Sequence, residues 1–272
     1  MSDKLPNMPD HLVEVDSVFG MLRAYKDDLI TDQIIQFGNH TRPEFAFATC
    51  LLSPGMSVID IGAHIGTFAL TAARKVGASG TVVAVEANKR TFNLLKNNVN
   101  RLRFSNVEVQ HQMIGLPNTD YSGHAIDGNT GGFHITSGPQ QKGGGPAPVT
   151  TLDDLVSVTQ IQPDFIKIDI EGLEQVAIET CAYIQDHKPL LYLEVSDPHL
   201  KRHGGSAEAL ERILRNLGYE FFVNTGQRNA ANDIFTIGQL QSLTDRHKLF
   251  DTLCIPRGNK LLPTMRKYAS GE

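Results

Sequence analysis

The sequence predicts an α/β protein with a doubly wound, mostly parallel sheet and helices on both faces. Short apolar strands end at Asp60 and Glu86, and each is followed by a helical pattern, at residues 67–76 and 89–101. Another strand–helix unit follows at residues 165–184. Because strands that alternate with helices join by right-handed crossovers, this order favours a parallel sheet with a ligand crevice at the carboxyl ends of its strands.

Apolar alternation predicts seven strands, and amphipathic spacing predicts the helices between them. The strands are expected at residues 58–60, 81–85, 106–110, 165–169, 190–195, 220–224 and 252–255. A helix is expected over residues 172–184, and Ser206 and Gly218 bound another. Residues 1–53 are expected to form an N-terminal extension, a hairpin followed by helices. We find no second domain boundary and treat residues 1–272 as a single domain.

Residues 115–147 interrupt this alternation. They are rich in Gly, Ser, Thr and Asn, and residues 121–126 and 132–136 can pair as a hairpin. Two interpretations are open. The segment is either a disordered surface excursion or a mobile flap over a substrate, and the second follows from the frequent functional role of long loops in compact domains. Three histidines in and near this segment are candidates for substrate contact, namely His111, His124 and His134.

The composition is that of an ordinary soluble protein, with 40% hydrophobic and 20% charged residues in 272. A net charge of -5 gives no overall attraction for nucleic acid or anionic membranes. No segment is long and apolar enough to span a membrane, and the polar N-terminus lacks a signal-peptide core. The three cysteines are widely spaced within apolar patterns, which is typical of reduced thiols. We therefore expect a cytoplasmic protein.

The most informative stretch is Asp60-x-Gly62-x-His64-x-Gly66, which turns from a strand directly into a helix. Such a turn lets a ligand approach the backbone at a helix N-terminus. Glu86, at the tip of the next strand, is placed to accept hydrogen bonds from ribose hydroxyls. The spacing does not fit G-x-G-x-x-G, whose second glycine lets the backbone approach a pyrophosphate. We therefore predict a site for an adenosine-containing cofactor; the alternative is a tight turn with two solvated acids.

This pattern resembles motif I of the class I methyltransferases that use S-adenosylmethionine (SAM). The segments Pro163-Asp-Phe-Ile-Lys-Ile-Asp-Ile-Glu-Gly-Leu-Glu174 and Thr151-Leu-Asp-Asp-Leu155 are similar to the FkbM family of these enzymes, and the resemblance covers residues 44–218. It implies a Rossmann-like seven-stranded sheet and methyl transfer from SAM to a hydroxyl of a sugar or polyketide-like small molecule, leaving S-adenosylhomocysteine (SAH). His64 stands where the family often has Asn, which keeps a hydrogen-bonding side chain.

The predicted cofactor-binding residues gather at the carboxyl ends of the first, second and fourth strands. They are Asp60, Gly62, Ala63, His64, Gly66, Glu86 and Asp169. Residues 110–114 contain no acid for the adenine amine, so that contact stays unassigned. An alcohol acceptor must lose a proton, so a base or a cation beside the methyl group is expected.

Three residues near strand ends are the catalytic candidates: Asp169, Glu194 and His199. Asp169 with Glu194 or His199 would act as a general base pair. The alternative is a Mg²⁺ site of Asp169, Glu171 and Glu194 that lowers the pKa of the acceptor, although a metal is not expected. A purely structural alternative has Lys167 neutralising Asp169, and Glu171 favouring a helix N-terminus through its dipole.

The leading hypothesis is a SAM-dependent O-methyltransferase for a small hydroxylated molecule, with no nucleic-acid or membrane partner. The oligomeric state is open, a homodimer included. An N-methyltransferase on the same fold is the first alternative, but Ile170-Glu-Gly172 stands where the Asn/Asp-Pro-Pro-aromatic run of such enzymes would be. A SAM-binding module without activity is the second alternative, because a fold alone does not establish function.

Overall fold

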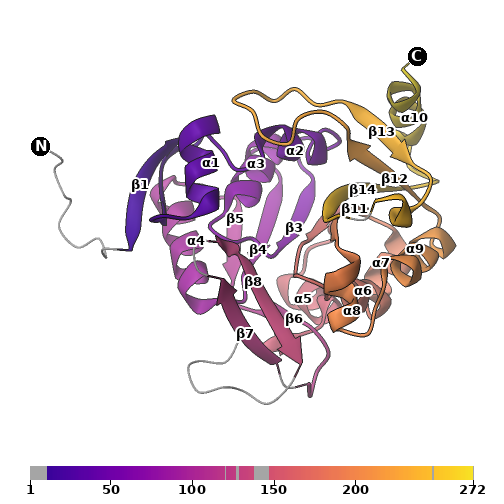
Figure 1. Ribbon diagram of the computed structural model, residues 1–272, viewed down its shortest axis with the longest axis horizontal. Helices are drawn as coiled ribbons and strands as arrows, with labels where there is room; N and C mark the ends of the chain where they lie inside the picture. The colour runs from indigo at the N-terminus through magenta and orange to yellow at the C-terminus, as the bar shows by residue number, and fades with distance from the viewer. Residues whose placement is uncertain (1–10, 120, 127–128, 138–146, 247, 272) are drawn as a thin grey trace, which may run out of the picture.

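The computed structural model describes residues 11–119, 121–126, 129–137, 147–246 and 248–271. Within them the chain forms one large sheet with helices on both faces (Figure 1). In sheet order its strands are β13 (Ile237–Leu240), β12 (Tyr219–Asn224), β14 (Phe250–Pro256), β11 (Leu190–Val195), β10 (Phe165–Ile168), β3 (Ser57–Ile61), β4 (Thr81–Val85) and β5 (Val107–Gln110). The strands from β11 to β5 are parallel, whereas β14 runs antiparallel to both of its neighbours. The predicted α/β fold with a doubly wound, mostly parallel sheet is confirmed.

The predicted number of strands is wrong, because the described residues contribute eight strands to this sheet rather than seven. The additional strand is β13, which pairs antiparallel with β12 at the sheet edge and places Leu240 beside Phe221. Its sequence, Ile-Gly-Gln-Leu, is short and carries a glycine that weakens strand preference. Pairing with β12, rather than local preference, therefore makes this segment a strand.

Successive residues of the central strands point to opposite faces, and a hydrophobic cluster forms on each face. In β3, Val58 packs in one cluster and Ile59 in the other. The face of Val58 is covered by α1 (Leu29–Phe37), α2 (Arg42–Ala48), α3 (Thr67–Val76), α4 (Lys89–Arg101) and α10 (Leu262–Ser270). The face of Ile59 is covered by α5 (Leu152–Thr159), α6 (Glu174–Glu179), α7 (Ala182–His187), α8 (Asp197–Arg202), α9 (Ala207–Asn216) and the 3₁₀ turn η1 (Leu243–Asp245). In the part of the chain that the structure describes, no helix combines the length and the apolar character needed to cross a membrane.

An N-terminal hairpin of β1 (Leu12–Ser17) and β2 (Gly20–Tyr25) packs against α4. The buried side chain of Asn98 holds it there, accepting a hydrogen bond from the Arg23 N–H at 2.9 Å and donating to the carbonyls of Arg23 and Ile65, both at 3.0 Å. Because Ile65 belongs to the turn after β3, Asn98 ties the hairpin to the predicted cofactor loop.

The single helix predicted over residues 172–184 is wrong, because the chain forms two short helices there, α6 and α7. The break lies at Thr180 and Cys181. Asp153, on α5, accepts hydrogen bonds from the N–H groups of Ala182 and Tyr183 at 2.8 and 3.0 Å. This side chain caps α7 from a distant part of the chain, which a local sequence pattern does not reveal.

The predicted insertion contains the expected pairing, with β7 (Tyr121–Ile126) antiparallel to β8 (Asn129–Ser137). Two further short strands, β6 (Met113–Ile114) and β9 (Val149–Thr150), pair in parallel at its base. Residues 138–146, with their three consecutive glycines, lie outside the described residues, as do residues 1–10 and the side chains of His124 and His134. The role of the insertion as a substrate flap stays a prediction.

The turn after β3 depends on the absence of a side chain at Gly62. Its φ of +79° lies in the left-handed region, and a Cβ built there would lie 1.9 Å from the carbonyl oxygen of Asp169. Neighbouring strands β3 and β10 thus bring two backbone segments into direct contact at the point where both strands end. Only glycine allows this approach without strain.

We expect Gly62→Ala to lower the free energy of unfolding by at least about 2 kcal/mol, because of backbone strain and this clash. Urea unfolding followed by circular dichroism measures the change. Gly258→Ala is the matched control, since its φ is outside the left-handed region and a Cβ would meet nothing within 4 Å. It should change stability by less than about 0.5 kcal/mol. Equal losses in the two variants would contradict the close-approach argument.

Candidate functional site

A cavity of about 280 Å³ opens at the carboxyl ends of β3, β4, β10 and β11. The chain reverses its order in the sheet between β3 and β10, and ligands of open α/β sheets bind at such switch points. Helices α1 and α2 contribute Leu29, Ile30 and Phe45 to its lining. Among the predicted site residues, those that line it are Gly62, Ala63, His64, Glu86, Asp169, Glu171 and Glu194. Asp60, Gly66 and His199 are not in its lining.

Glu86 is held at the tip of β4 by two backbone donors. Its Oε2 accepts a hydrogen bond from the His64 N–H at 2.9 Å, and its Oε1 accepts one from the Asn88 N–H at 2.7 Å. The side chain is buried, and burial raises its pKa to about 7 although both N–H groups lower it. The carboxyl group therefore has a fixed position at the cavity wall.

Two histidines at the cavity are kept neutral by burial. Burial lowers the pKa of His64 to about 4 and that of His40 to about 3. His64 has a φ of +50°, in the left-handed region where Asn and His are enriched among non-glycine residues. This explains why His can take the place of Asn in the turn. His40 was missed in the sequence, because it lies between α1 and α2 and outside every strand end.

Lys167 joins the first and fourth predicted strands through a buried ion-pair network. Its Nζ lies 3.3 Å from Asp60 Oδ1 and 3.1 Å from Asp169 Oδ2, and it donates to the Gly62 carbonyl at 3.3 Å. Lys167 and Asp60 are direct partners in the register of β10 and β3. Burial acts to lower the pKa of Lys167, but the two carboxylates reverse this and hold it above its ordinary value. Asp60 is completely buried and contacts the lysine rather than the cavity.

The loop after β10 is fixed from two directions. Glu174 is buried and its Oε1 accepts hydrogen bonds from the N–H groups of Ile170 and Gly172, at 2.9 and 3.2 Å. Gly172 has a φ of +115°, and a Cβ there would lie 2.2 Å from the carbonyl oxygen of His199. The loop and α8 are therefore in backbone contact, which sets Glu171 beside His199.

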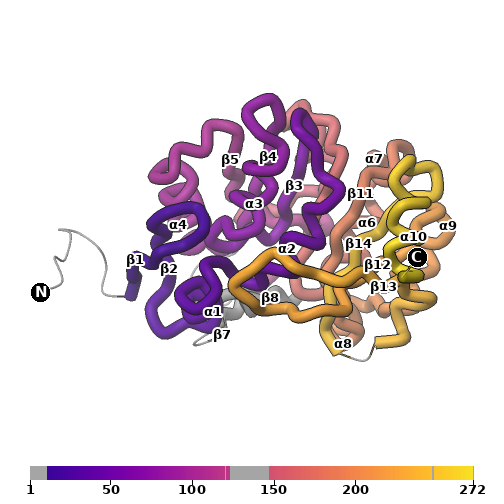
Figure 2. The backbone as a smooth tube through the Cα atoms, turned by 90° about the horizontal axis from the view of Figure 1, so that it is seen from above, coloured from indigo at the N-terminus to yellow at the C-terminus, as the bar shows by residue number. Residues whose placement is uncertain are grey.

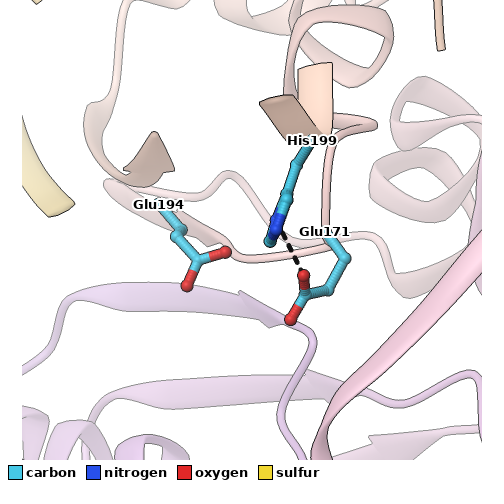
Figure 3. A group of neighbouring side chains, drawn as sticks. All are labelled: Glu171, Glu194 and His199. Atoms are coloured by element: carbon cyan, nitrogen blue, oxygen red, sulfur yellow. Dashed lines mark ion pairs between the residues drawn. The ribbon is translucent and has the colours of Figure 1, made fainter. Parts of the chain in front are cut away.

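Glu171, Glu194 and His199 form a cluster at the end of β11 (Figure 3). His199 Nδ1 lies 2.8 Å from Glu171 Oε2, and one potential ligand atom from each of the three residues lies within 4.8 Å of the others. Glu171 and Glu194 line the cavity, with Glu194 half-buried. Asp169, which the sequence placed in an acidic metal set, is instead paired with Lys167, and His199 is the third member of the cluster.

A second polar network lies beyond β11, and Tyr192, Arg228 and Asp251 connect it to the cavity. Glu44, on α2, accepts hydrogen bonds from the Tyr192 hydroxyl at 3.0 Å and from the Asn224 side chain at 3.1 Å. Asp251, on β14, forms an ion pair with Arg228, and both line the cavity. Arg228 comes from the segment between β12 and β13, which reaches across to α2 (Figure 2). No strand or helix pattern marks that segment, so the sequence did not indicate Arg228.

Gln112 is a further cavity residue that the sequence reasoning missed. Its side-chain Oε1 is buried and has no hydrogen-bond partner among the described residues. It precedes β6, within residues 110–114, which contain no acid. An amide oxygen accepts a hydrogen bond as a carboxylate does, so Gln112 offers the cavity an acceptor that a pattern of acidic residues does not reveal.

The chain thus folds as an α/β protein with a cavity at the switch point of its sheet, the place where such folds bind ligands. The FkbM methyltransferase domain family matches residues 60–221. The chain therefore belongs to this family, and it is a SAM-dependent methyltransferase with SAM as its cofactor.

Solved structures similar to this one are also methyltransferases. Precorrin-6y C5,15-methyltransferase from Geobacter metallireducens is 14% identical over 79% of this chain and 86% of its own, with a TM-score of 0.42. A SAM-dependent methyltransferase from Aquifex aeolicus is 17% identical over 78% and 88%, with a TM-score of 0.40. An O-methyltransferase from Bacillus cereus in complex with SAH is 14% identical over 79% and 80%, with a TM-score of 0.43. These similarities are distant, and we draw no conclusion about the acceptor from them. No curated protein matches the chain.

We expect the affinity for SAH to rise with pH through about 7 and then to level off. Below that pH the Glu86 carboxyl is protonated and accepts hydrogen bonds poorly, whereas above it the carboxylate accepts them from ribose hydroxyls. Glu86→Gln should bind SAH at least about tenfold more weakly at high pH, through loss of charge-assisted hydrogen bonds. It should also lose the pH dependence. Calorimetry at several pH values measures both effects. If the SAH affinity of the variant still rises through pH 7, the pH dependence belongs to another group.

Proposed function

We propose that this protein is an O-methyltransferase that transfers the methyl group of SAM to a hydroxyl of a small molecule, of sugar or polyketide-like type. The observation that carries the proposal is the pair of carboxyl groups, Asp169 and Glu194, at the cavity wall. Asp169 directly follows β10 and Glu194 lies on β11, and β3 separates these strands from β4, which Glu86 directly follows. Glu86 and the pair of Asp169 and Glu194 therefore lie at different ends of the cavity. An acceptor hydroxyl at the second end would have a carboxylate beside it to take its proton.

The residues present fit a bound SAM molecule. Glu86 is held with both oxygens oriented by backbone donors, and we assign it to the ribose hydroxyls. The buried Oε1 of Gln112 lacks a partner among the described residues, and we assign it to the adenine amine. Asp60 would act through Lys167 and the turn at Gly62, since it contacts the lysine. The neutral state of His40 and His64 keeps positive charge away from a cationic cofactor.

When bound, SAM would supply a methyl group on a positively charged sulfur; the acceptor oxygen would attack the methyl carbon in line, with the thioether of SAH as leaving group. The work of this chain is to orient the acceptor and to receive its proton, and orientation can contribute about 7–11 kcal/mol. We assign Asp169 as the proton acceptor, because it lines the cavity and Lys167 fixes its Oδ2. As the oxygen–carbon bond forms and the sulfur–carbon bond breaks, the hydroxyl proton passes to Asp169. Glu194 lines the same cavity, and His199 lies in the neighbouring cluster with Glu171.

Gln112→Leu is expected to weaken SAH binding by about 1 kcal/mol, or roughly fivefold, because the adenine amine loses its acceptor. S-inosylhomocysteine carries an oxygen in place of that amine and should bind the variant and the unaltered protein with similar affinity. Calorimetry with SAH and S-inosylhomocysteine on both proteins measures these affinities. An equal loss for both would show that Gln112 supports the cavity rather than the amine.

Asp169→Asn is expected to lower turnover by at least about 100-fold, the range of general base catalysis, and to leave SAH affinity nearly unchanged. Turnover is measured with labelled SAM and a panel of hydroxylated and amine metabolites. Asp186→Asn, at an exposed position on α7, is the control. Equal losses of turnover and SAH affinity would reassign Asp169 to cofactor binding.

The same panel tests the alternatives. Label on amines alone would favour an N-methyltransferase, and intact SAH binding without any transfer would favour a non-catalytic module. Because composition predicts a cytoplasmic protein, we propose intracellular small molecules for the panel.

A further inference from the structure

We propose that Glu171, Glu194 and His199 bind a divalent first-row transition-metal ion, such as Mn²⁺, beside the place where the acceptor oxygen binds. The inference rests on the proposed function only in the role given to the ion; the site itself stands on the geometry of the three side chains. The cluster differs from the acidic Mg²⁺ set considered from the sequence, because it includes an imidazole and excludes Asp169.

The three side chains come from separate elements and point into one space (Figure 3). Glu171 lies in the loop after β10, Glu194 on β11, and His199 on α8. Their ligand atoms lie within 4.8 Å of one another. Ions of this kind bind carboxylate and imidazole atoms at about 2.0–2.2 Å, so small side-chain rotations bring all three atoms onto one ion. Backbone contact between Gly172 and His199 holds two of the three elements together.

The negative charges around the cluster favour the binding of a cation. Four other carboxyl groups act on Glu194: Asp169, Glu171, Asp251 and Glu174. Two of the nearby cations are already paired, Lys167 with Asp60 and Asp169 and Arg228 with Asp251, whereas Arg202 acts on Glu171 from an exposed position. Among the described residues no hydrogen bond or ion pair reaches the Glu194 carboxylate, which is directed into the cluster. Buried carboxylates are normally paired or bound to a metal.

The ligand set indicates which ion would bind. An imidazole nitrogen suits Mn²⁺, Fe²⁺, Co²⁺ and Zn²⁺ better than the hard Mg²⁺, whereas two carboxylates suit Mn²⁺ especially well. Three protein ligands leave coordination positions open toward the cavity, because Glu171 and Glu194 both line it. An acceptor hydroxyl bound at such a position has a lower pKa. The ion would thus help Asp169 to receive the proton, and it would select acceptors with a hydroxyl that reaches the cluster.

The test is Mn²⁺ binding to the full-length protein, measured by electron paramagnetic resonance without SAM or acceptor. We expect saturable binding of one ion, weakened at least about tenfold in Glu194→Gln and in His199→Ala. The matched controls are Glu208→Gln and His187→Ala, at exposed positions on α9 and α7, and they should bind Mn²⁺ as the unaltered protein does. SAH calorimetry on every variant shows that the fold and the cofactor site are intact.

No saturable Mn²⁺ binding in the unaltered protein would overturn the inference, as would equal affinity in the cluster variants and the controls. Failure of the inference is distinguishable from failure of the proposed function. Methylation of a hydroxyl in the presence of EDTA, without Mn²⁺ binding, would leave the O-methyltransferase standing and remove the metal. Specific loss of Mn²⁺ binding in the cluster variants would support the site even if no hydroxyl acceptor is methylated.

Discussion

The buried ion-pair network around Lys167 is the interaction on which the site depends. A lysine and a completely buried aspartate are each costly to remove from water, and either one without the other would destabilise the strand ends. Together, Lys167 and Asp60 connect β10 to β3, and the lysine also reaches Asp169 and the carbonyl of Gly62. One positive charge therefore sets the relative positions of the cofactor turn and the carboxylate proposed to receive the acceptor proton.

The segment from Lys167 to Glu174 combines structural and chemical roles within eight residues. Lys167, Gly172 and Glu174 are structural: they pair buried charge, allow backbone contact with α8, and cap the loop N–H groups. Asp169 and Glu171 face the cavity between them. The run is distinctive as a sequence because each position meets a separate physical requirement, and a change at a structural position would displace the carboxylates that line the cavity.

Charge is distributed unevenly along the cavity. Burial keeps His40 and His64 neutral on the side of α2 and the turn after β3. Carboxyl groups dominate beyond β10, where Glu171 and Glu194 meet. Lys167 and Arg228 also line the cavity and act on His40, but carboxylates pair with both of them, Asp60 and Asp169 with the lysine and Asp251 with the arginine. The two neutral histidines therefore add no further positive charge beside a cationic cofactor. At the second end the excess of negative charge suits a cation, whether carried by a metal ion or by the methyl sulfonium itself.

The sequence alone determined the order of strands and helices and the turn at Gly62, because these follow from local periodicity. It also determined that Glu86, Asp169 and Glu194 lie near strand ends, and the carboxyl ends of parallel strands lie together. Tertiary structure decided which of these side chains reach the cavity. Asp60 faces Lys167 across two paired strands, and Gln112 and Arg228 enter the wall from segments without a periodic pattern.

Contacts between distant residues also decided the remaining differences. β13 forms because it pairs with the edge of β12. α6 and α7 are separate because Asp153 caps the second helix. Glu171 lies beside His199 because Gly172 allows the two backbones to come into contact. Local preference is worth tenths of a kcal/mol to about 1 kcal/mol per residue, so a single buried hydrogen bond or steric contact from elsewhere in the chain overrides it.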